Sequence, residues 1–237
     1  MNYSGVIDLS IAENVKLIRE KIDSAAASAG QVRGGVSLVA ATKAVDAAQA
    51  AESIAAGVSA CGENRVQEML AKNEQGAYSG APLHFIGHLQ KNKVKHVVGL
   101  CSLIQSVDSL ELLSLISKRA EALNIRQDLL LEINIAQESS KAGIPAEALD
   151  EILSFASHFP SIFVRGLMAI PPISYIKGEN RPYFAQMYKL FVDNSAKKYD
   201  NVSMDFLSMG MSGDFEDAIL EGSNMVRVGS AIFGGRT

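Results

Sequence analysis

Short apolar runs alternate with longer amphipathic segments along nearly the whole chain. The runs contain β-branched residues and few polar positions, which is typical of strands buried on both faces of a parallel sheet. The longer segments repeat apolar residues at helical spacing, which predicts helices with one buried face. The predicted strands are 36–42, 58–63, 83–88, 101–107, 129–135, 164–170, 202–209 and 225–233. The predicted helices are 8–29, 45–56, one ending near 74, a short one ending at 97, 109–123, 147–158, 180–197 and 214–221.

The order of these elements predicts the fold class. Strands that alternate with helices indicate a parallel sheet with right-handed crossovers, and eight repeats favour closure into a single (β/α)8 TIM barrel. Too few residues follow the last strand for a full eighth helix, so helix 8–29 is expected to cover the barrel there. The alternative, an open doubly wound sheet, usually carries a G-x-G-x-x-G turn where ATKAVDAAQ stands. No linker interrupts the pattern, so 1–237 is expected to form one domain.

Composition and charge narrow the function. The 237 residues carry 22 basic and 26 acidic side chains, a formal charge of −4. They form no basic stripe, so nucleic acid is not expected as a partner. No apolar run is long enough to span a membrane, and acids stand where a signal peptide would be basic. Cys61 and Cys101 lack the close spacing of a metal or redox pair. We therefore expect a soluble, cytoplasmic protein.

Lys43 is the first candidate for chemistry. It ends the first predicted strand, after a run with no other charge from Gly34 onward. Its amine is therefore expected at the C-terminal mouth of the barrel, where the sites of this fold lie. A free lysine has a pKa of about 10.4, and partial burial would lower it and favour a Schiff base with an aldehyde. The alternative is an ordinary lysine that reaches solvent, and position alone does not decide between the two.

Two turns rich in small residues are the second candidate. SMGMSGDFEDA (208–218) and RVGSAIFGGR (227–236) follow the seventh and eighth strands, where barrels frequently bind phosphate. Small residues leave backbone N–H groups open to an anion. The candidate positions in these two turns are Ser208, Met209, Gly210, Met211, Ser212, Gly229 and Ser230. A plainer interpretation of the first turn is a capped helix, with Ser212 and Gly213 at its N-cap, followed by Asp214 and Glu216.

The two candidates become neighbours when the barrel closes, because strand eight then lies beside strand one. A reactive lysine next to a phosphate-binding turn predicts a ligand that carries both an aldehyde and a phosphate. Pyridoxal phosphate satisfies this combination, and so do the sugar phosphates of aldolases.

Six motifs, taken in order, identify a resemblance that covers the chain from residue 34 to its end. They are LVAATK, CGENRVQE, LHFIGHLQKNK, EINIAQESSKAG, RGLMAIPP and SMGMSGDFEDAILEGSNMVRVGSAIFG. Together they resemble the pyridoxal phosphate homeostasis proteins, whose barrel is of the alanine racemase N-terminal domain type. The resemblance implies pyridoxal 5′-phosphate as the cofactor, held as a Schiff base on Lys43. It also implies that Asn64 lies near the ring hydroxyl, that Arg227 faces the pyridine nitrogen, and that the phosphate is surrounded by Ser208, Met209, Ser212, Gly229 and Ser230.

The function that the resemblance implies is homeostasis of the vitamin B6 cofactor, by a carrier without catalytic turnover. An arginine such as Arg227 gives up no full proton to the ring nitrogen, so the ring remains a weak electron sink. This disfavours transamination, whereas racemases of this barrel type manage with such an arginine. Racemases of this type also use a tyrosine from a second domain that is not expected in this chain, which favours a carrier and a monomer. Apoenzymes that use the cofactor are candidate partners. The alternatives are a pyridoxal-phosphate-dependent racemase or decarboxylase and a sugar-phosphate aldolase.

The remaining polar and aromatic groups are assigned to structure. His84 and His88 share a face of the third strand and His96 follows, but no carboxylate stands at ligand spacing, so we expect hydrogen bonds and no metal. Tyr175 and Tyr183 are interpreted as packing in preference to a lid. The core-facing residues of helix 180–197 are predicted to be Tyr183, Phe184, Met187, Tyr188 and Phe191.

Overall fold

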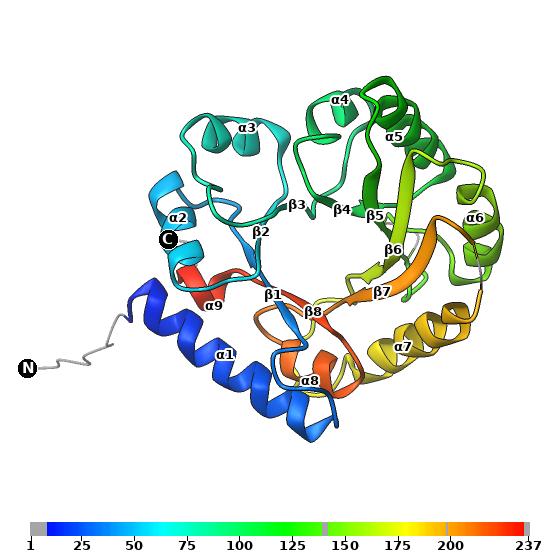
Figure 1. Cartoon of the computed structure of the whole chain (residues 1–237). Helices are drawn as coiled ribbons and strands as arrows, with labels where there is room; N and C mark the ends of the chain where they lie inside the picture. Colours follow the sequence, from blue (N-terminus) through cyan, green and yellow to red (C-terminus); the bar gives the residue numbers. More distant parts are fainter. Residues whose placement is uncertain (1–8, 139–141, 198, 235–237) are drawn as a thin grey trace, which may run out of the picture.

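The strands form the closed barrel that their alternation with helices predicts (Figure 1). The computed structural model describes residues 9–138, 142–197 and 199–234. The parallel strands pair in chain order, and β8 closes the ring against β1. They are β1 (Ser37–Ala41), β2 (Ala60–Glu63), β3 (Leu83–Phe85), β4 (Leu103–Val107), β5 (Gln127–Ile133), β6 (Ile162–Ala169), β7 (Val202–Ser208) and β8 (Met225–Val228).

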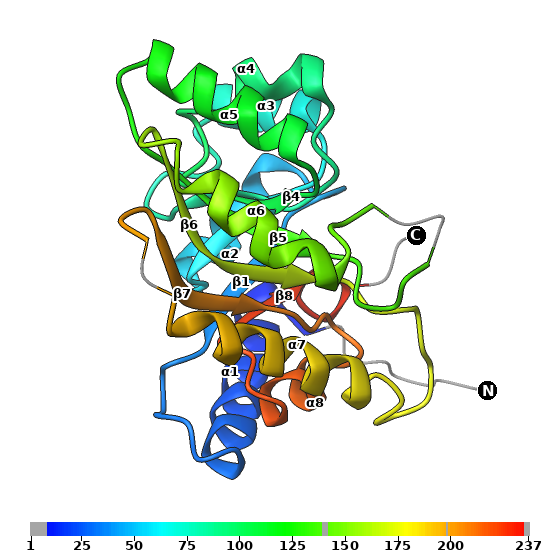
Figure 2. The same ribbon diagram turned by 90° about the vertical axis from the view of Figure 1, so that its right-hand side faces the viewer.

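The helices surround the ring of strands (Figures 1 and 2). Two of them begin with capping boxes, Ser10 with Glu13 and Asp46 with Gln49, which satisfy the first free backbone N–H groups. They are α1 (Ile11–Ser28), α2 (Ala47–Ala55), α3 (Val66–Glu74), the 3-10 turn η1 (Lys91–Lys93) with α4 (Val94–Val97), α5 (Leu110–Ala122), the turn η2 (Ala146–Ala148) with α6 (Leu149–Ala156), α7 (Arg181–Ser195), α8 (Phe215–Leu220) and α9 (Ser230–Phe233).

Helix α1 covers the barrel beside β8, which confirms the expectation for the N-terminal helix. It packs against α8 and α9 (Figure 1). Its Ile18 and Ile22 share one apolar cluster with Val226 and Val228 of β8. The four-residue helix α9 is too short to cover this strand by itself, so the chain uses its first helix in place of a last one.

The barrel interior is filled by side chains in layers, as closed barrels of this size require. An apolar layer consists of Val39, Ala60, Leu103, Leu130, Met168 and Met225. Side chains two positions further along a strand point the same way. On β4, β5 and β8 these next residues are polar, namely Gln105, Glu132 and Arg227. The interior therefore changes from apolar to polar toward the C-terminal mouth.

The eighth strand is shorter than predicted. The run 225–233 was expected to be one strand, but β8 ends at Val228 and α9 begins at Ser230. The hydroxyl of Ser212 accepts hydrogen bonds from the N–H groups of Gly229 and Ala231. The Gly229 and Ala231 N–H groups are therefore bonded to a side chain and not to a neighbouring strand. The apolar character of residues 225–233 gave no indication of this.

Two aromatic side chains also depart from the predictions. Tyr188 of α7 is 45% exposed, whereas Phe184 and Met187 are buried as expected. The Tyr188 ring lies over Gly222, where an added Cβ would come within 2.3 Å of it, so the ring packs on the turn after α8. Tyr175 is 97% exposed, which contradicts its assignment to packing.

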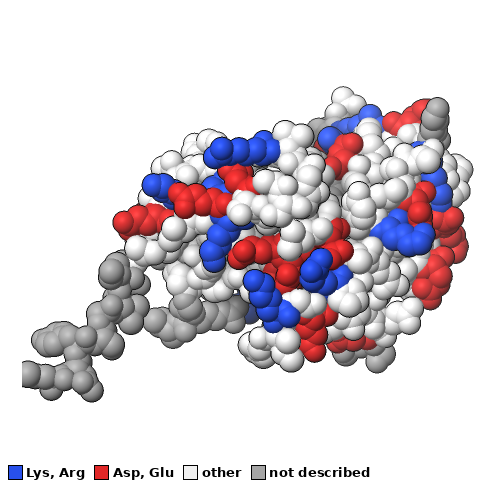
Figure 3. Space-filling view, turned by 90° about the horizontal axis from the view of Figure 1, so that it is seen from below, with Lys and Arg blue, Asp and Glu red and all other residues white. Residues whose placement is uncertain are grey.

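Charge of both signs is interspersed on the face shown in Figure 3. Ion pairs join neighbouring helices, such as Lys21 of α1 with Glu216 of α8 at 3.6 Å. Nothing on this face resembles a basic stripe. Among the described residues, none of the helices combines the length and the apolar character that a membrane crossing needs.

Candidate functional site

Lys43 lies at the C-terminal mouth of the barrel. Val39 of β1 belongs to the apolar layer inside the barrel, Ala41 continues on the same side of the strand, and Lys43 stands in the turn two residues beyond β1. The register pairs Ala41 with Gly62 of β2, so Lys43 and Asn64 each follow within two residues of the ends of neighbouring strands. Lys43 is exposed, and an amine must be accessible if it is to react with a ligand that enters from solvent.

Asn64 presents a buried acceptor to this mouth. Its Oδ1 is buried and receives no hydrogen bond from the described residues. Gly87 permits the arrangement, because a Cβ at that position would lie 2.4 Å from the Asn64 backbone oxygen. The hydroxyl of Ser106 fixes Gly87 by donating to its carbonyl at 2.5 Å. A buried oxygen without a donor is unfavourable, so this atom suits the hydroxyl of a ligand.

The turns after β7 and β8 adjoin, as the sequence predicts. Ser212 Oγ accepts from the backbone N–H of Gly229 at 3.2 Å and of Ala231 at 3.3 Å, which leaves its own hydrogen to donate. A Cβ on Gly229 would lie 3.3 Å from Ala41, so this turn also touches the end of β1. Within the described chain, the N–H groups of Ser212, Gly213 and Ser230 donate to no residue, and such groups can bind an anion.

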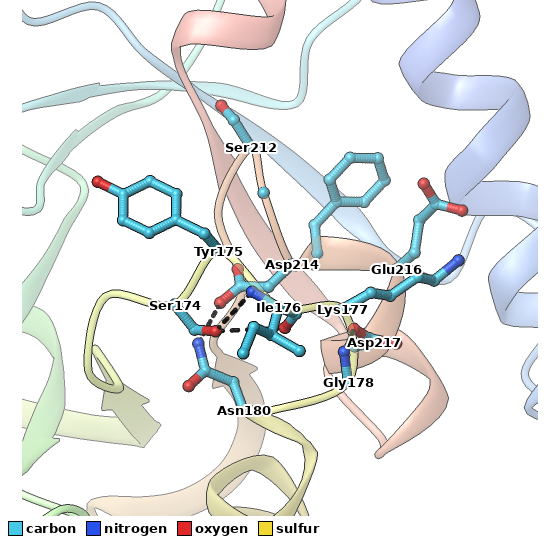
Figure 4. Close-up of a pocket in the computed structure, with 12 residues that line it drawn as sticks. Ser174, Tyr175, Ile176, Lys177, Gly178, Asn180, Ser212, Asp214, Glu216 and Asp217 are labelled. Carbon is cyan, nitrogen blue, oxygen red and sulfur yellow. Dashed lines mark hydrogen bonds between the residues drawn. The ribbon is translucent and has the colours of Figure 1, made fainter.

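The alternative role of Ser212 as a helix N-cap is wrong. Helix α8 begins at Phe215 with Asp214 at the N-cap position. Asp214 instead joins two loops, since its carboxylate accepts from Met211 N at 2.8 Å and from Asn180 Nδ2 at 2.9 Å. A cavity of about 350 Å³ lies between these loops. Figure 4 shows Asp214 near the centre of the lining residues, with Ser212 above it, Tyr175 to the left and Asn180 below.

Arg227 lies inside the barrel, on the buried strand that its flanking valines predict. It is 4% exposed, and its guanidinium donates to Ser208 Oγ at 2.6 Å and to Ala169 O at 3.0 Å. Burial lowers the pKa of Arg227 to about 10, although Glu132 and Asp214 act in the opposite direction. The guanidinium therefore stays protonated at neutral pH. Two of its five N–H groups are used by these bonds, so donors remain for a ligand.

A chain of hydrogen bonds orients Arg227. Ser208 Oγ accepts from Arg227 and donates to Gln105 Oε1 at 2.6 Å, and Gln105 Nε2 lies 3.0 Å from His84 Nδ1. Because an amide nitrogen only donates, His84 Nδ1 must be the acceptor. Burial lowers the pKa of His84 to about 4, which keeps the imidazole neutral and able to accept.

The structure does not group Ser208 and Met209 with the other residues predicted around the phosphate. The Ser208 hydroxyl is fully buried, and its hydrogen is engaged by Gln105. The N–H of Met209 donates to Met225 O at 3.1 Å, and its side chain belongs to the main apolar core. Ser212, Gly229 and Ser230 form the group at the mouth.

Two of the histidines have polar partners, one by a hydrogen bond and one by a contact to a carboxylate. His84 accepts from Gln105, and His88 Nδ1 lies 3.1 Å from Asp108 Oδ2 beyond the end of β3.

Burial and the neighbouring Asp108 raise the pKa of Glu132, while Arg227 and His88 lower it. No group of three potential metal ligands occurs in the part of the chain that the structure describes.

Sequence reasoning missed the contribution of Gln105 and did not connect it with His84. The signal was present, because a glutamine and a histidine stand in otherwise apolar strands, LIQSV and LHF. A polar residue at an inward strand position needs a partner. Which partner it finds depends on strands brought together by closure, since Gln105 and Ser208 are 103 positions apart.

Comparisons with known proteins show what the chain as a whole is similar to. The family model for the alanine racemase N-terminal domain matches residues 10–237. A pyridoxal phosphate homeostasis protein from Aquifex aeolicus is 40% identical over 228 residues, covering 96% of this chain and 99% of the relative. The structure of PipY from Synechococcus elongatus with PLP bound, at 32% identity, superimposes with a TM-score of 0.82 over 95% of this chain and 100% of PipY.

A more distant likeness concerns the fold alone. An alanine racemase from Clostridium difficile has a TM-score of 0.67 at 16% identity, over 94% of this chain and 57% of the racemase. This likeness confirms the predicted barrel type. The match to the homeostasis proteins, at higher identity and over nearly their full length, decides the family. The chain is a member of the pyridoxal phosphate homeostasis protein family, built on the alanine racemase N-terminal type of barrel.

Proposed function

We propose that this chain binds pyridoxal 5′-phosphate as a Schiff base on Lys43 and maintains the supply of this cofactor as a carrier without catalytic turnover. The observation that carries the proposal is the placement of Lys43 just after β1, with Asn64 Oδ1, which accepts from none of the described residues, just after the neighbouring β2, and with the Ser212–Gly229 turns against Ala41 at the end of β1. An aldehyde and an anion can be held together only where an amine and a set of N–H donors meet. PipY, a relative with PLP bound, supports the choice of ligand.

Each residue has a proposed task. Lys43 supplies the nitrogen that bonds to the aldehyde carbon, and Asn64 Oδ1 accepts from the ring hydroxyl. Ser212 and Ser230 donate their hydroxyls, with the free N–H groups of the same turns, to the phosphate. Charge-assisted bonds of this kind contribute about 1.5–3 kcal/mol each. Arg227 faces the ring nitrogen.

Ser208 and Met209 act behind these residues in the proposal. Ser208 orients the Arg227 guanidinium, and Met209 holds the turn after β7 through its bond to Met225 and its place in the core. Both therefore contribute to cofactor binding without a direct contact to the phosphate.

The chemistry of Arg227 disfavours transamination, which needs a strong electron sink, but does not separate a carrier from a racemase. The bound cofactor would supply an electrophilic carbon and a ring that withdraws electrons. A guanidinium with a pKa of about 10 is protonated at neutral pH and can only donate, so the ring nitrogen next to it stays unprotonated and the ring withdraws electrons weakly. The competing proposal is an amino-acid racemase or decarboxylase on the same barrel.

Partners, compartment and assembly are part of the same proposal. Apoenzymes that require the cofactor are the proposed recipients. Two buried free thiols, Cys61 and Cys101, fit a reducing cytoplasm. Ile173, Tyr175 and Ile176 are exposed together on the loop after β6. The other exposed large apolar side chains are spread along the chain from Leu9 to Leu220, which supports a monomer. We also propose that 1–237 folds as one domain, since the barrel closes within it.

The experiment compares absorption spectra of the wild-type chain and Lys43→Ala after addition of pyridoxal 5′-phosphate. The imine band should be present in the wild type and absent in Lys43→Ala. Lys95→Ala, which removes an exposed lysine from α4, is the control and should keep the band. Borohydride should attach the ligand to Lys43 alone. A wild-type chain that cannot form the imine would refute the proposal.

A second measurement separates a carrier from an enzyme. The loaded protein is incubated with single-enantiomer amino acids, and the enantiomers and amines are quantified over time. We expect no turnover above that of the free cofactor. Repeated turnovers that disappear in Lys43→Ala would replace the carrier proposal with the racemase or decarboxylase.

A further inference from the structure

A charged cluster next to Lys43 holds the backbone on both sides of it. Glu63 ends β2, while Glu68 and Lys72 lie one turn apart on α3. The side chains of Glu63 and Lys72 are 0% and 6% exposed, and that of Glu68 is 25% exposed. Buried charges are unfavourable unless they are paired and hydrogen-bonded; Glu63 Oε1 makes such bonds, whereas Glu63 Oε2 accepts from none of the described residues. The bonds of each member therefore show what the cluster holds in place.

The ammonium of Lys72 donates to three oxygens. They are Thr42 O at 2.5 Å, Glu63 Oε1 at 2.9 Å and Glu68 Oε1 at 2.8 Å, which together use all three N–H groups of an ammonium. Glu63 Oε1 also accepts from Thr42 Oγ1 at 2.7 Å and from the Tyr78 hydroxyl at 2.9 Å. Thr42, the residue before Lys43, is therefore fixed through its carbonyl and its hydroxyl.

The residue after Lys43 is held by the same cluster. Ala44 donates its N–H to Glu68 Oε1 at 2.6 Å, the oxygen that also accepts from Lys72. Ala44 has a φ of 61°, in the left-handed region that residues with a Cβ seldom adopt. Such a residue persists only where its surroundings hold it. The carboxylate of Glu68 provides the hold.

We propose that Glu68, supported by Lys72 and Glu63, is a positioning residue that sets the direction in which Lys43 projects into the barrel mouth. The inference rests on the proposed function. There the Lys43 nitrogen forms a bond to the aldehyde carbon, and the aldehyde oxygen leaves as water. This step needs a defined approach of nitrogen to carbon.

The phosphate turns and Arg227 lie apart from this cluster. The phosphate turns are joined by the bond from Gly229 to Ser212, and Arg227 is oriented by Ser208. Loss of the Glu68 carboxylate would free the Ala44 N–H and let the strained turn relax. The amine of Lys43 would then be misplaced while phosphate and ring binding continued.

The test uses two ligands that differ only at the reacting carbon, pyridoxal 5′-phosphate and its alcohol pyridoxine 5′-phosphate. Both are titrated into the wild-type chain, Glu68→Ala and Glu68→Gln. We expect Glu68→Ala to weaken the Kd of the aldehyde about tenfold, or ~1.4 kcal/mol, and that of the alcohol by less than about threefold. Glu68→Gln keeps an oxygen for Ala44 and should recover most of the loss. Glu74→Ala, at an exposed position of the same helix, should match the wild type.

Two results would overturn the inference. Equal losses for both ligands would show a general weakening of the fold, and no loss for either would show that the cluster does not position Lys43. Should Glu68→Ala fail to fold, Thr42→Val removes one hydroxyl of the cluster and must give the same selective loss. A wild-type chain that forms no imine refutes the proposed function and the inference together, whereas an imine in the wild type with unselective variants refutes the inference alone.

Discussion

Ser208→Ala tests whether Ser208 serves Arg227 or the phosphate. The hydroxyl makes two buried bonds of 2.6 Å, one from the Arg227 guanidinium and one to Gln105. A bond to a charged group contributes about 1.5–3 kcal/mol and a neutral bond about 0.5–1.5 kcal/mol. We therefore expect the free energy of unfolding to fall by about 2–4 kcal/mol, within the roughly 5–15 kcal/mol that domains possess.

Urea denaturation of the cofactor-free chain measures this change. Ser203→Ala is the matched control on the same strand, because its hydroxyl bonds only the exposed Asp205, and it should change stability by less than about 0.5 kcal/mol. Titration with pyridoxine 5′-phosphate measures the other role. Ser212→Ala should weaken this ligand more than Ser208→Ala does. A Ser208→Ala variant with unchanged stability and a loss of affinity as large as that of Ser212→Ala would refute the assignment.

Three further results follow from buried groups. His84 has a pKa of about 4 in the folded chain against about 6.5 in the unfolded chain. The free energy of unfolding therefore keeps its full value above pH ~6.5 and falls by up to ~1.4 kcal/mol per pH unit as the pH drops toward 4. His84→Asn should remove this slope in denaturation experiments between these two pH values. Gly87→Ala should cost about 3 kcal/mol in the same assay, because its Cβ would overlap the Asn64 backbone. Burial raises the thiol pKa of Cys61 to about 11 and of Cys101 to about 12, so both should react with a disulfide reagent only after denaturation.

Controls exist for these measurements as well. His158 is exposed, and His158→Asn should leave the pH slope unchanged. A Cβ on Gly213 would meet nothing within 4 Å, so Gly213→Ala should leave stability nearly intact. If a thiol of the native chain reacted as fast as free cysteine, the buried positions of these side chains would be contradicted.

The barrel was predictable because the same short sequence pattern, a strand followed by a helix, repeats along the chain. Each strand is an apolar run and each helix an amphipathic one, and the order of the two leaves few topologies. The end of β8 was not predictable, because it depends on the hydroxyl of Ser212 bonding to Gly229 and Ala231. Tyr188 was placed in the core by helical period, yet its environment is set by Gly222 on another element.

The position of Lys43 was predictable for a similar reason. A lone charge at the end of a buried strand must emerge at the mouth, and strand order then fixes its neighbours. The roles of Ser208 and Ser212 were harder to separate, because both are serines in one glycine-rich turn. The strand end and the loop differ in what surrounds them: Ser208 ends β7 inside the barrel, beside Arg227, whereas Ser212 lies on the loop outside the ladder.

The cluster beside Lys43 could have been predicted from the spacing of residues along α3, although not from the composition. Val66, Met69 and Lys72 follow one another at three-residue spacing on α3, and all three are buried. A lysine in register with apolar residues on a helix is expected to face the core, where an ammonium needs its full set of acceptors. Acidic Glu63 stands at the end of the preceding buried strand. A cation on the apolar face of a helix together with an acid at a strand end therefore predicts an internal ion pair. That pair reaches the neighbouring strand through the Thr42 carbonyl, next to Lys43.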